Sequence, residues 1–510
     1  MFSRLLLRAA LPLLVCCGAP IAAQDAPISQ ADLRRHIEML ASDAFQGRAP
    51  ATEGERLSTG YIIDQLRRRG IEPAGDNGGW LQAVPLVERA TRNETAAWTA
   101  NGRPLDFDAN EIALQGRETQ EAVRDAPVLF AGHGARMPEH GIDQIEGADV
   151  RGAVVLILVD APQVPGFPSI ADRVKAMADA GAAAVIALTD IDLPWQLVRE
   201  NYRRPATRLA SQGVPPIIGA MPLSAAQRLV EAAGGDFERL FNEQTGPGFR
   251  AVTLPLRASL NVTTQVNSYS THNVVGRIRG SGAGGLGESI LLMAHWDHFG
   301  TCRPEGEPDR ICNGAVDNAS GVAELIEVAG RIAAGPRPTR DVIVLATTAE
   351  ENGLLGAAWF AAHPPVPLAR IVAGINMEMP AIAPAGAPVT VIGRGYPPLD
   401  NVVGQAIVAA GRTIDASGAT QGYAQHQDGW ALASAGVPTV LIGGGFSDAE
   451  RLNAYLENRY HSSADAADAS LELGGAAEDA NLIVDIARRL ADPAIYQRSQ
   501  AETDQQGAHP

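Results

Sequence analysis

The stretch SILLMAHWDHFG (289–300) is followed by AVDNASGVAELIEVAGRIAAG (315–335) and then by DVIVLATTAEENG (341–353). The first and third segments begin with short apolar runs, which are typical of buried strands, and the middle segment has the apolar spacing of a helix. The alternation predicts an α/β sheet that is flanked by helices. It continues through RIVAGINMEMP (370–380), PVTVIG (388–393), LDNVVGQAIVAAG (399–411), VPTVLIGG (437–444) and ANLIVDIARRLA (480–491).

Polar side chains follow these predicted strands at the points where the strands end. Ligands of open α/β sheets collect outside the carboxyl ends of the strands, so we expect these side chains to converge. Several are carboxylates, and without cations some of them would have to take up protons. A pair of divalent metal ions would remove this repulsion. Three predicted strands are followed by His295, Asp297 and His298, by Glu350 and Glu351, and by Glu378. Asp317 falls at the start of a predicted helix, and the segment NRYHSS (458–463) supplies Tyr460 and His461.

The residue types in this cluster indicate a particular chemistry. Imidazole nitrogen together with carboxylate oxygen suits Zn²⁺, with positions left open for water. Two such ions, about 3.5–4 Å apart, need a bridging carboxylate and can hold an activated hydroxide between them. A neighbouring free carboxylate can take the proton of that water and pass it to a leaving group. The cluster therefore predicts metal-assisted hydrolysis.

Five short motifs carry these residues in a recognisable order. They resemble the motifs of the di-zinc exopeptidases of metallopeptidase family twenty-eight, which include secreted bacterial aminopeptidases and the glutamate carboxypeptidase II/transferrin receptor branch. The resemblance implies a three-layer α/β/α fold with a mixed central sheet and an inserted, smaller α/β domain known as the protease-associated domain. The motifs are H-x-D (295–297), D-N-x-S-G (317–321), E-E-x-G-x-x-G (350–356), N-x-[DE]-M (376–379) and Y-H (460–461).

The resemblance also implies which residues would hold two Zn²⁺ ions. His295, Asp317 and Glu378 would bind one ion. Asp317, Glu351 and His461 would bind the other, so that Asp317 bridges the pair.

Three further residues receive catalytic roles from the resemblance. Glu350 would act as the general base and acid for a metal-bridging hydroxide. Asp297 would orient His295, because a ligating imidazole normally donates its other N–H to a carboxylate or carbonyl. Tyr460 would donate to the oxyanion of the tetrahedral intermediate. His298 has two open interpretations, a role in the pocket or an ordinary place in the loop.

Two departures from the family pattern bear on the substrate. Many relatives have Asp where this chain has Glu378, and in a related di-zinc group Asp tends to accompany aminopeptidases and Glu carboxypeptidases. Many relatives also have Ser-Asp-His where this chain has Gln427, Asp428 and Gly429, in a segment that lines their specificity pocket. The leading hypothesis is an aminopeptidase that removes N-terminal residues from peptides.

Several alternatives remain open. A carboxypeptidase or dipeptidase of the same fold would need an Arg to hold the substrate carboxylate, and Arg394, Arg451 and Arg459 are candidates. A non-peptide amide hydrolase would use the same site. The single-zinc glutaminyl cyclases share the fold, but the presence of both His295 and Glu378 argues against that activity. An inactive, receptor-like binding protein should have lost ligands, and this chain has lost none.

The domain organisation is predicted from the same resemblance. The peptidase domain would comprise residues 24–115 and 261–495, and a polar tail would comprise residues 496–510. Residues 116–260 would form the inserted protease-associated domain, on the basis of the segments FAGHG (130–134) and KAMADAGAAAVIAL (175–188).

The N-terminal segment, MFSRLLLRAALPLLVCCGAPIAAQD, has a basic start, an apolar stretch and small residues at its end. This anatomy predicts a secretory signal peptide over residues 1–23, cut near Ala23, and a secreted or periplasmic protein. Lipid attachment at Cys16 or Cys17 is the alternative, although the residue before a lipidated Cys is normally small. No other segment has the roughly 18–20 uninterrupted apolar residues that span a bilayer, so no membrane contact is expected after signal removal.

Charge and cysteine content narrow the partners further. The 58 acidic and 41 basic residues give a net charge of −17, which disfavours nucleic acid as a partner. The resemblance to the exopeptidases implies a peptide substrate. Cys302 and Cys312 remain after signal removal and flank a loop rich in Pro and Gly. In an oxidising compartment we expect a disulfide between them, with a pair of thiolate metal ligands as the rival interpretation.

Overall fold

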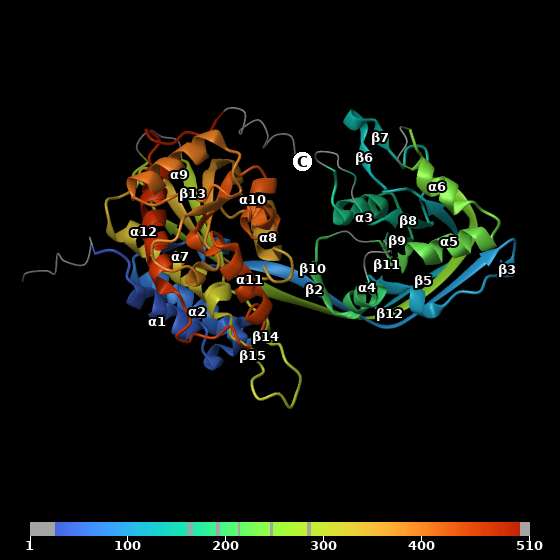
Figure 1. Ribbon diagram of the computed structural model, residues 1–510, viewed down its shortest axis with the longest axis horizontal. Coiled ribbons are helices and arrows are strands. Elements are labelled where there is room, and N and C mark those ends of the chain that lie inside the picture. Colours follow the sequence, from blue (N-terminus) through green and yellow to red (C-terminus); the bar gives the residue numbers. More distant parts are fainter. Residues whose placement is uncertain are drawn as a thin grey trace, which may run out of the picture. The chain divides into compact units, whose positions relative to one another are not determined.

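The computed structural model describes residues 26–499, with gaps at 161, 163–166, 190–193, 213–214, 245–247 and 283–286. The predicted signal peptide, Cys16, Cys17 and residues 500–510 of the predicted tail lie outside the described residues. The chain forms two compact units (Figure 1). The terminal unit comprises the described residues up to Gln82 and from His272 onward, and the inserted unit comprises Ala83–Thr271.

The terminal unit contains a mixed sheet. Its larger strands are β12 (Val252–Ile278, final part), β13 (Ser289–His295), β16 (Asp341–Thr347), β17 (Ile371–Asn376), β18 (Thr390–Ile392) and β19 (Thr439–Gly443). They are arranged in the order β18-β19-β17-β13-β16-β12. The four central strands are parallel, whereas β18 and the end of β12 run antiparallel at the two edges. The short β1 (Glu72–Pro73) pairs with β12.

The helices of the terminal unit are α1 (Gln30–Leu40), α2 (Glu53–Arg68), α7 (Gly321–Ala334), α8 (Leu355–Ala362), α9 (Pro397–Ala409), α10 (Gly429–Ser434), α11 (Ala449–Asn458) and α12 (Leu473–Leu490). They cover both faces of the sheet, because side chains alternate in direction along each strand. On β13, Leu292 and Ala294 belong to one apolar cluster, and Leu291 and Met293 belong to another.

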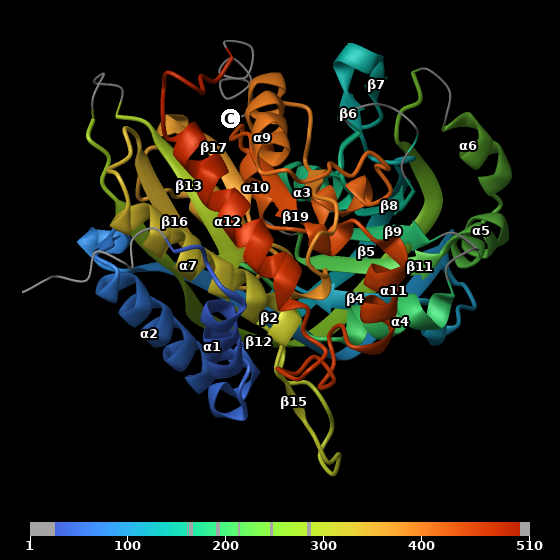
Figure 2. The same ribbon diagram turned by 60° about the vertical axis from the view of Figure 1, so that its left-hand side comes forward.

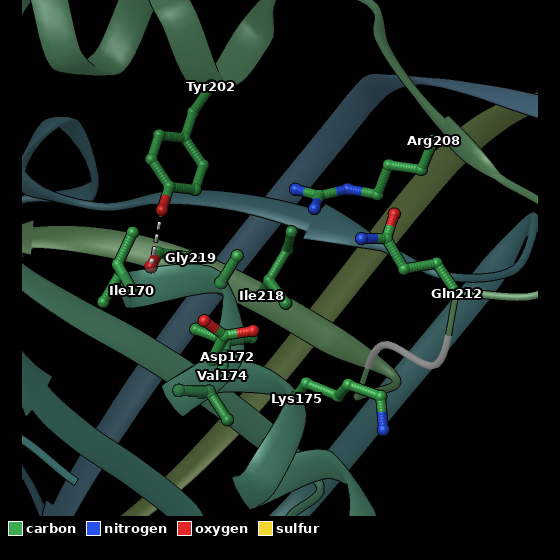
Figure 3. Close-up of a pocket in the computed structure, with 11 residues that line it drawn as sticks. Ile170, Asp172, Val174, Lys175, Tyr202, Arg208, Gln212, Ile218 and Gly219 are labelled. Atoms are coloured by element: carbon green, nitrogen blue, oxygen red, sulfur yellow. Dashed lines mark hydrogen bonds between the residues drawn. The ribbon is translucent and has the colours of Figure 1, made fainter. Parts of the chain in front are cut away.

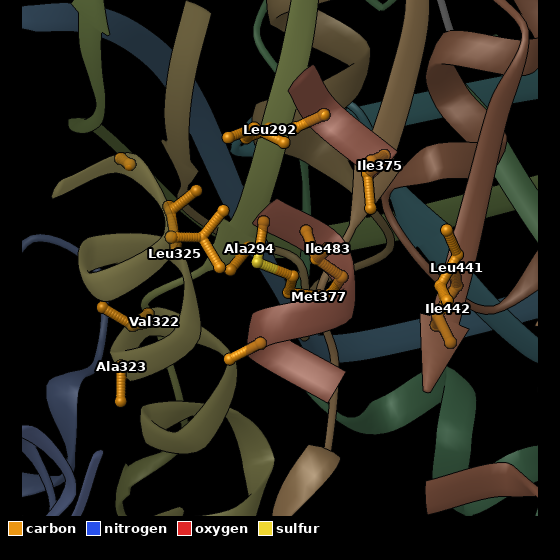
Figure 4. Close-up of a cluster of buried hydrophobic side chains, with 14 of the residues drawn as sticks. Leu292, Ala294, Val322, Ala323, Leu325, Ile375, Met377, Leu441, Ile442 and Ile483 are labelled. Atoms are coloured by element: carbon orange, nitrogen blue, oxygen red, sulfur yellow. The ribbon is translucent and has the colours of Figure 1, made fainter. Parts of the chain in front are cut away.

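The first of these clusters, drawn in part in Figure 4, includes side chains of α1, α2, α7, α9, α11 and α12. The second includes side chains of α8 and α10. Figures 1 and 2 both show α7 and α12 side by side. The unit is therefore a three-layer α/β/α structure with a mixed central sheet, as the sequence predicted.

The larger strands of the inserted unit are β4 (Ala113–Gly116), β5 (Gln120–Phe130), β8 (Val154–Leu158), β9 (Ala184–Thr189), β11 (Ile217–Pro222) and the first part of β12. The order is β12-β5-β8-β9-β11-β4, and the middle four strands are parallel. Its helices are α3 (Ile170–Asp179), α4 (Trp195–Arg203), α5 (Leu223–Ala232) and α6 (Phe237–Glu243). The strands β2 (Leu81–Ala100), β3 (Arg103–Pro104), β6 (Arg136–Met137), β7 (Ile142–Asp143) and β10 (Ala206–Leu209) complete it.

A cavity of about 160 Å³ lies within the inserted unit (Figure 3). Its lining includes Ile170 and Lys175 of α3 and Arg208 of β10. Tyr202 of α4 also lines it and donates a hydrogen bond from its hydroxyl to the carbonyl of Gly219, at 3.3 Å. None of the site residues predicted from the sequence belongs to this unit.

The unit boundaries differ from the predicted ones, which lay at 115/116 and 260/261. The structure divides at 82/83 and 271/272, where β2 and β12 pass from one unit into the other without interruption. Because strands rather than Gly/Pro-rich linkers make these crossings, no change of composition marks them. Tyr496, the first residue of the predicted polar tail, is 1% exposed, and its hydroxyl donates to the carbonyl of Val372 at 3.1 Å.

A small hairpin of β14 (Gly300–Thr301) and β15 (Ile311–Cys312) follows β13. Cys302 and Cys312 form a disulfide bond across it, as predicted. Among the described residues, no helix is both long enough and apolar enough to cross a membrane.

The first apolar cluster leads to a prediction about stability. Leu292 is 0% exposed, so Leu292→Ala should lower the free energy of unfolding by about 2–5 kcal/mol, because it removes buried methyl groups and leaves a cavity. Val408 on α9 is 67% exposed, and Val408→Ala should change the same quantity by less than about 0.5 kcal/mol. Urea unfolding followed by tryptophan fluorescence measures both variants. Equal midpoints for the two would contradict the position of Leu292 in the core.

Candidate metal centre

The parallel strands bring the predicted site residues together at the carboxyl ends of the central strands. His295 is the last residue of β13 and pairs in register with Thr347, the last residue of β16. Met293 pairs with Asn376, the last residue of β17. The carboxyl ends of three neighbouring strands therefore meet, and the segments that follow them carry Asp297, His298, Glu350, Glu351 and Glu378.

Asp317 lies between two histidines. One oxygen of its carboxylate is 3.2 Å from Nε2 of His295, and the other is 3.5 Å from Nε2 of His461. The same nitrogen of His461 is 3.0 Å from Oε2 of Glu351. The carboxylate of Asp317 is thus placed so that it could bridge one ion bound by His295 and a second ion bound by His461.

Glu350 and Glu378 form a second group with His295. Oε2 of Glu350 is 3.9 Å from Nε2 of His295. Two groups of side chains have possible ligand atoms within 4.8 Å of one another: His295, Asp317 and Glu351, and His295, Glu350 and Glu378. The structure therefore gathers all five of the predicted ligands and the predicted general base.

The donor atoms of this cluster fit zinc. Nε2 of His295 is buried and has no hydrogen-bond partner among the described residues, although the carboxylate of Asp317 is close. Such an atom is costly to bury unless a cation takes the place of the missing partner. The imidazole nitrogens favour zinc over Mg²⁺ or Ca²⁺, and carboxylate oxygens are also common zinc ligands.

The protonation of the carboxylates also indicates a site for a cation. Burial, partly offset by His295, raises the pKa of Glu378 to about 8. Burial also raises the pKa of Glu350 well above its usual range. Burial of Asp317 is outweighed by its contacts with His295 and His461, which hold its pKa below the usual value. A metal-free cluster therefore retains protons that a divalent cation would replace.

A short, fully buried turn positions Asp317. It spans Ala315–Ser320, and the backbone N–H groups of Val316 and Asp317 both donate to the carboxylate of Asp465, at 3.0 Å. The hydroxyl of Tyr455 donates to the same carboxylate at 3.0 Å. Sequence reasoning missed Asp465. Its only signal was an acidic residue four positions after His461.

Asn318 connects this turn to the segment that carries Glu378. Its side-chain amide donates to the carbonyl of Met377 at 3.1 Å, and its side-chain oxygen accepts from the N–H of Met379 at 3.2 Å. A Cβ atom at Gly321 would lie 2.3 Å from that oxygen and 2.4 Å from the carbonyl of Met377. The close approach explains why glycine ends the D-N-x-S-G motif.

Asp297 acts on its neighbours in two ways. Its carbonyl oxygen is 3.3 Å from Nδ1 of His295, while its carboxylate is 3.8 Å from that nitrogen. The carboxylate accepts the backbone N–H of Glu350 at 3.1 Å. His298, whose place the sequence left open, is buried, with Nδ1 2.5 Å from Oε1 of Glu351.

Aromatic rings surround His461. The ring of Tyr460 stacks on the imidazole with centroids 3.5 Å apart, and the ring of Phe299 meets it edge-on at 4.4 Å. Burial raises the pKa of Tyr460 above its usual range, so its hydroxyl keeps its proton and can donate. Phe299 is 38% exposed and offers an apolar surface beside the site.

The segment that departs from the family pattern supports Glu378. The side-chain amide of Asn376 donates to Oε2 of Glu378 at 3.0 Å and to Oε1 of Gln427 at 2.8 Å. Asp428 accepts a hydrogen bond from the hydroxyl of Thr347. Gln427 therefore orients Asn376, and Asn376 orients Glu378. The residue type of Gln427 alone did not indicate this role.

Comparison with known proteins bears on this site. Residues 273–486 match the family model described as peptidase family M28. A curated relative, a probable lipoprotein aminopeptidase of Mycobacterium tuberculosis, is 26% identical over 317 residues, or 61% of this chain. The matched part is 50% of the length of that relative.

A solved structure, an aminopeptidase from Aneurinibacillus sp. strain AM-1, has a similar fold with a TM-score of 0.51 at 17% identity. The match covers 93% of this chain and 98% of that one. All five motifs fall inside the range matched by the family model, and their side chains meet at one edge of the sheet. The family match is thus confined to residues 273–486, and over that range the chain has the features of a zinc metallopeptidase of peptidase family M28.

Proposed function

We propose that this zinc metallopeptidase is a di-zinc aminopeptidase, which removes N-terminal residues from peptides. The observation that carries the proposal is the position of Asp317 between His295 and His461, which suits a carboxylate shared by two ions. The curated relative is itself named an aminopeptidase, which supports the direction of attack.

In this proposal, His295, Asp317 and Glu378 hold one zinc ion, and Asp317, Glu351 and His461 hold the other. Bound zinc supplies Lewis-acid charge that acidifies water and polarises the scissile carbonyl. The protein's own residues keep these ligands in place. Asp465 fixes the backbone of Asp317, and Asn376 fixes the carboxylate of Glu378.

Glu350 moves the proton. Its carboxylate takes a proton from the attacking water while the water oxygen bonds to the carbonyl carbon of the substrate. When the C–N bond breaks, the same proton passes from Glu350 to the leaving nitrogen. The hydroxyl of Tyr460 donates to the carbonyl oxygen as negative charge develops on it. The backbone contact with Asp297 holds the start of the Glu350 segment during both transfers.

A carboxypeptidase is the second candidate, because one arginine is available to bind a substrate carboxylate. Arg459 already donates to the carbonyls of Ala464 and Ala466, and Arg451 lies 3.6 Å from Glu472. Arg394 lines a pocket of about 340 Å³ together with Gln427 and Trp430.

Export and a protease-associated role for the inserted unit belong to the same proposal. The support for export is the anatomy of the predicted signal peptide and the disulfide between Cys302 and Cys312. The lipoprotein name of the curated relative also supports export, and it favours lipid attachment near Cys17 more than the sequence alone did.

The direction of attack can be tested with one peptide prepared in three forms: free at both ends, N-acetylated and C-amidated. We expect acetylation to block cleavage and amidation to leave it unchanged, because an aminopeptidase must bind the free α-amino group. Mass spectrometry of the products, with a chelated sample as control, reads out the result. Blockage by amidation alone would replace the proposal by the carboxypeptidase and direct attention to Arg394.

The role of Glu350 leads to a second prediction. Glu350→Gln keeps the shape of the side chain and removes its capacity to accept a proton, so kcat should fall by roughly 10²- to 10⁴-fold. Zinc content, measured by plasma mass spectrometry, should stay at the wild-type value because Glu350 is not a proposed ligand. Unchanged kcat in a zinc-replete variant would refute the mechanism.

The metal-free protein should lose stability as pH rises. Contacts with Asp317 and Glu351 outweigh the burial of His461 and raise its pKa from 6.5 to about 9, and the pKa of Glu378 is raised from 4.5 to about 8. Both folded-state values lie above the unfolded ones, so the folded chain binds more protons over this range. The stabilising contribution of protonated His461 is complete below about pH 6.5 and lost through about pH 9.

Differential scanning fluorimetry between pH 6 and pH 9 measures this effect. The melting temperature should fall with pH in EDTA and fall less with zinc, because the cation replaces the protons. An equal fall of the melting temperature with pH in EDTA and in zinc would contradict the proposed centre.

A further inference from the structure

Arg48 is a buried cation whose hydrogen bonds all go to backbone carbonyls. Its side chain is 0% exposed, and it donates to the carbonyl oxygens of Trp296 at 2.9 Å, Leu40 at 2.9 Å, Gly314 at 2.8 Å and Asn313 at 2.5 Å. Among the described residues, no carboxylate forms an ion pair with it within 4 Å. A guanidinium can satisfy several acceptors at once because its N–H groups form a rigid, planar fork.

The acceptors of Arg48 lie beside the proposed zinc ligands. Trp296 stands between His295 and Asp297, and Asn313 and Gly314 directly precede the turn that carries Asp317. The backbone carbonyl of Arg48 in turn accepts the N–H of His298 at 3.2 Å. One residue therefore joins two ligand-bearing segments to the end of α1.

The turn that carries Arg48 packs tightly between these segments. It spans Asp43–Arg48, and Gly47 has a φ of 64°. A Cβ atom at Gly47 would lie 2.5 Å from the carbonyl oxygen of Cys312 and 2.7 Å from that of Gly300. Asp43 accepts a hydrogen bond from the side chain of Asn313 at 2.8 Å. The turn is thus held against both strands of the disulfide-linked hairpin.

Charge also connects Arg48 to the centre. Burial lowers its pKa to about 10, partly offset by attraction to Asp465, Asp317 and Asp297, so it stays protonated at neutral pH. A buried charge is retained at high cost unless it is well solvated by fixed groups. Here the four carbonyls provide that solvation, and the guanidinium supplies a permanent positive charge near the buried carboxylates.

We propose that Arg48 is a positioning residue of the metal centre, which sets the spacing between the His295 and Asp317 segments so that they can bind zinc. The inference rests on the proposed function, because it takes these residues as zinc ligands. Residues that orient metal ligands typically contribute a factor of about 10–100 to metal affinity.

Arg173 provides a matched control in the inserted unit. It is 2% exposed and likewise donates to four backbone carbonyls, those of His133, Leu158, Val159 and Asp160. Loss of either arginine should destabilise its own unit. Only loss of Arg48 should alter metal binding if Arg48 positions the ligands.

The experiment compares Arg48→Lys, Arg48→Met, Arg173→Lys and Arg173→Met with the wild type in the full chain. Zinc affinity is measured by competition with a chromophoric chelator, and the geometry of the site is read from the visible absorption of bound Co²⁺. Circular dichroism of the metal-free proteins confirms folding. Arg48→Lys keeps the charge and most of the volume, and it carries the test if Arg48→Met does not fold.

We expect both Arg48 variants to bind zinc about 10- to 100-fold more weakly and to shift the Co²⁺ bands. Both Arg173 variants should keep the wild-type affinity and spectrum. Wild-type affinity and spectrum in folded Arg48→Lys would overturn the inference, as would an equal loss in the Arg173 variants. A wild-type protein that binds no zinc would instead overturn the proposed centre itself, and the inference with it.

Discussion

The burial of several carboxylates at one edge of a sheet is the constraint on which the terminal unit depends. Asp317, Glu350, Glu351 and Glu378 all lie close to one another, where water cannot screen their charges. Coulomb repulsion at such separations is large in a low-dielectric interior. The cluster can persist only with protons or cations between the carboxylates, so the surrounding structure has to hold them against a force that would drive them apart.

Hydrogen bonds between side chains and backbone groups hold the segments that carry these carboxylates. Asp465 accepts two N–H groups from the Asp317 turn, Asn318 connects the turn to the Glu378 segment, and Asp297 accepts the N–H of Glu350. The apolar clusters pack the helices on the two faces of the sheet. They fix the strands in register, and the register decides that His295 and the segments after β16 and β17 reach the same edge.

The sequence allowed the layers to be predicted, and also the residues that the structure gathers at the carboxyl ends of the strands, because both leave local signals. Apolar periodicity identifies strands and helices, and the candidate ligands lie in five ordered motifs. Three of these motifs lie at or directly after the carboxyl ends of strands, whereas Asp317 precedes α7 and His461 follows α11. The sequence indicated no role for Asp465 or Arg48, since each acts on backbone groups that any residue would supply. Gln427 could not be interpreted because its partner, Asn376, is 51 positions away. The unit boundaries escaped prediction because β2 and β12 cross them as continuous strands.

The turn at Asp43–Arg48 has a consequence for the order of events in biosynthesis. Because a chain is synthesised from its N-terminus, the residues of this turn are made long before Trp296, Asn313 and Gly314. The carbonyls of those three residues are the ones that Arg48 binds. All of the inserted unit, Ala83–Thr271, is translated in between. The guanidinium of Arg48 therefore lacks three of its four carbonyl acceptors while the inserted unit is synthesised. The His295 and Asp317 segments acquire their final spacing only when residues 296–314 reach the turn at Asp43–Arg48, which was synthesised about 250 residues earlier.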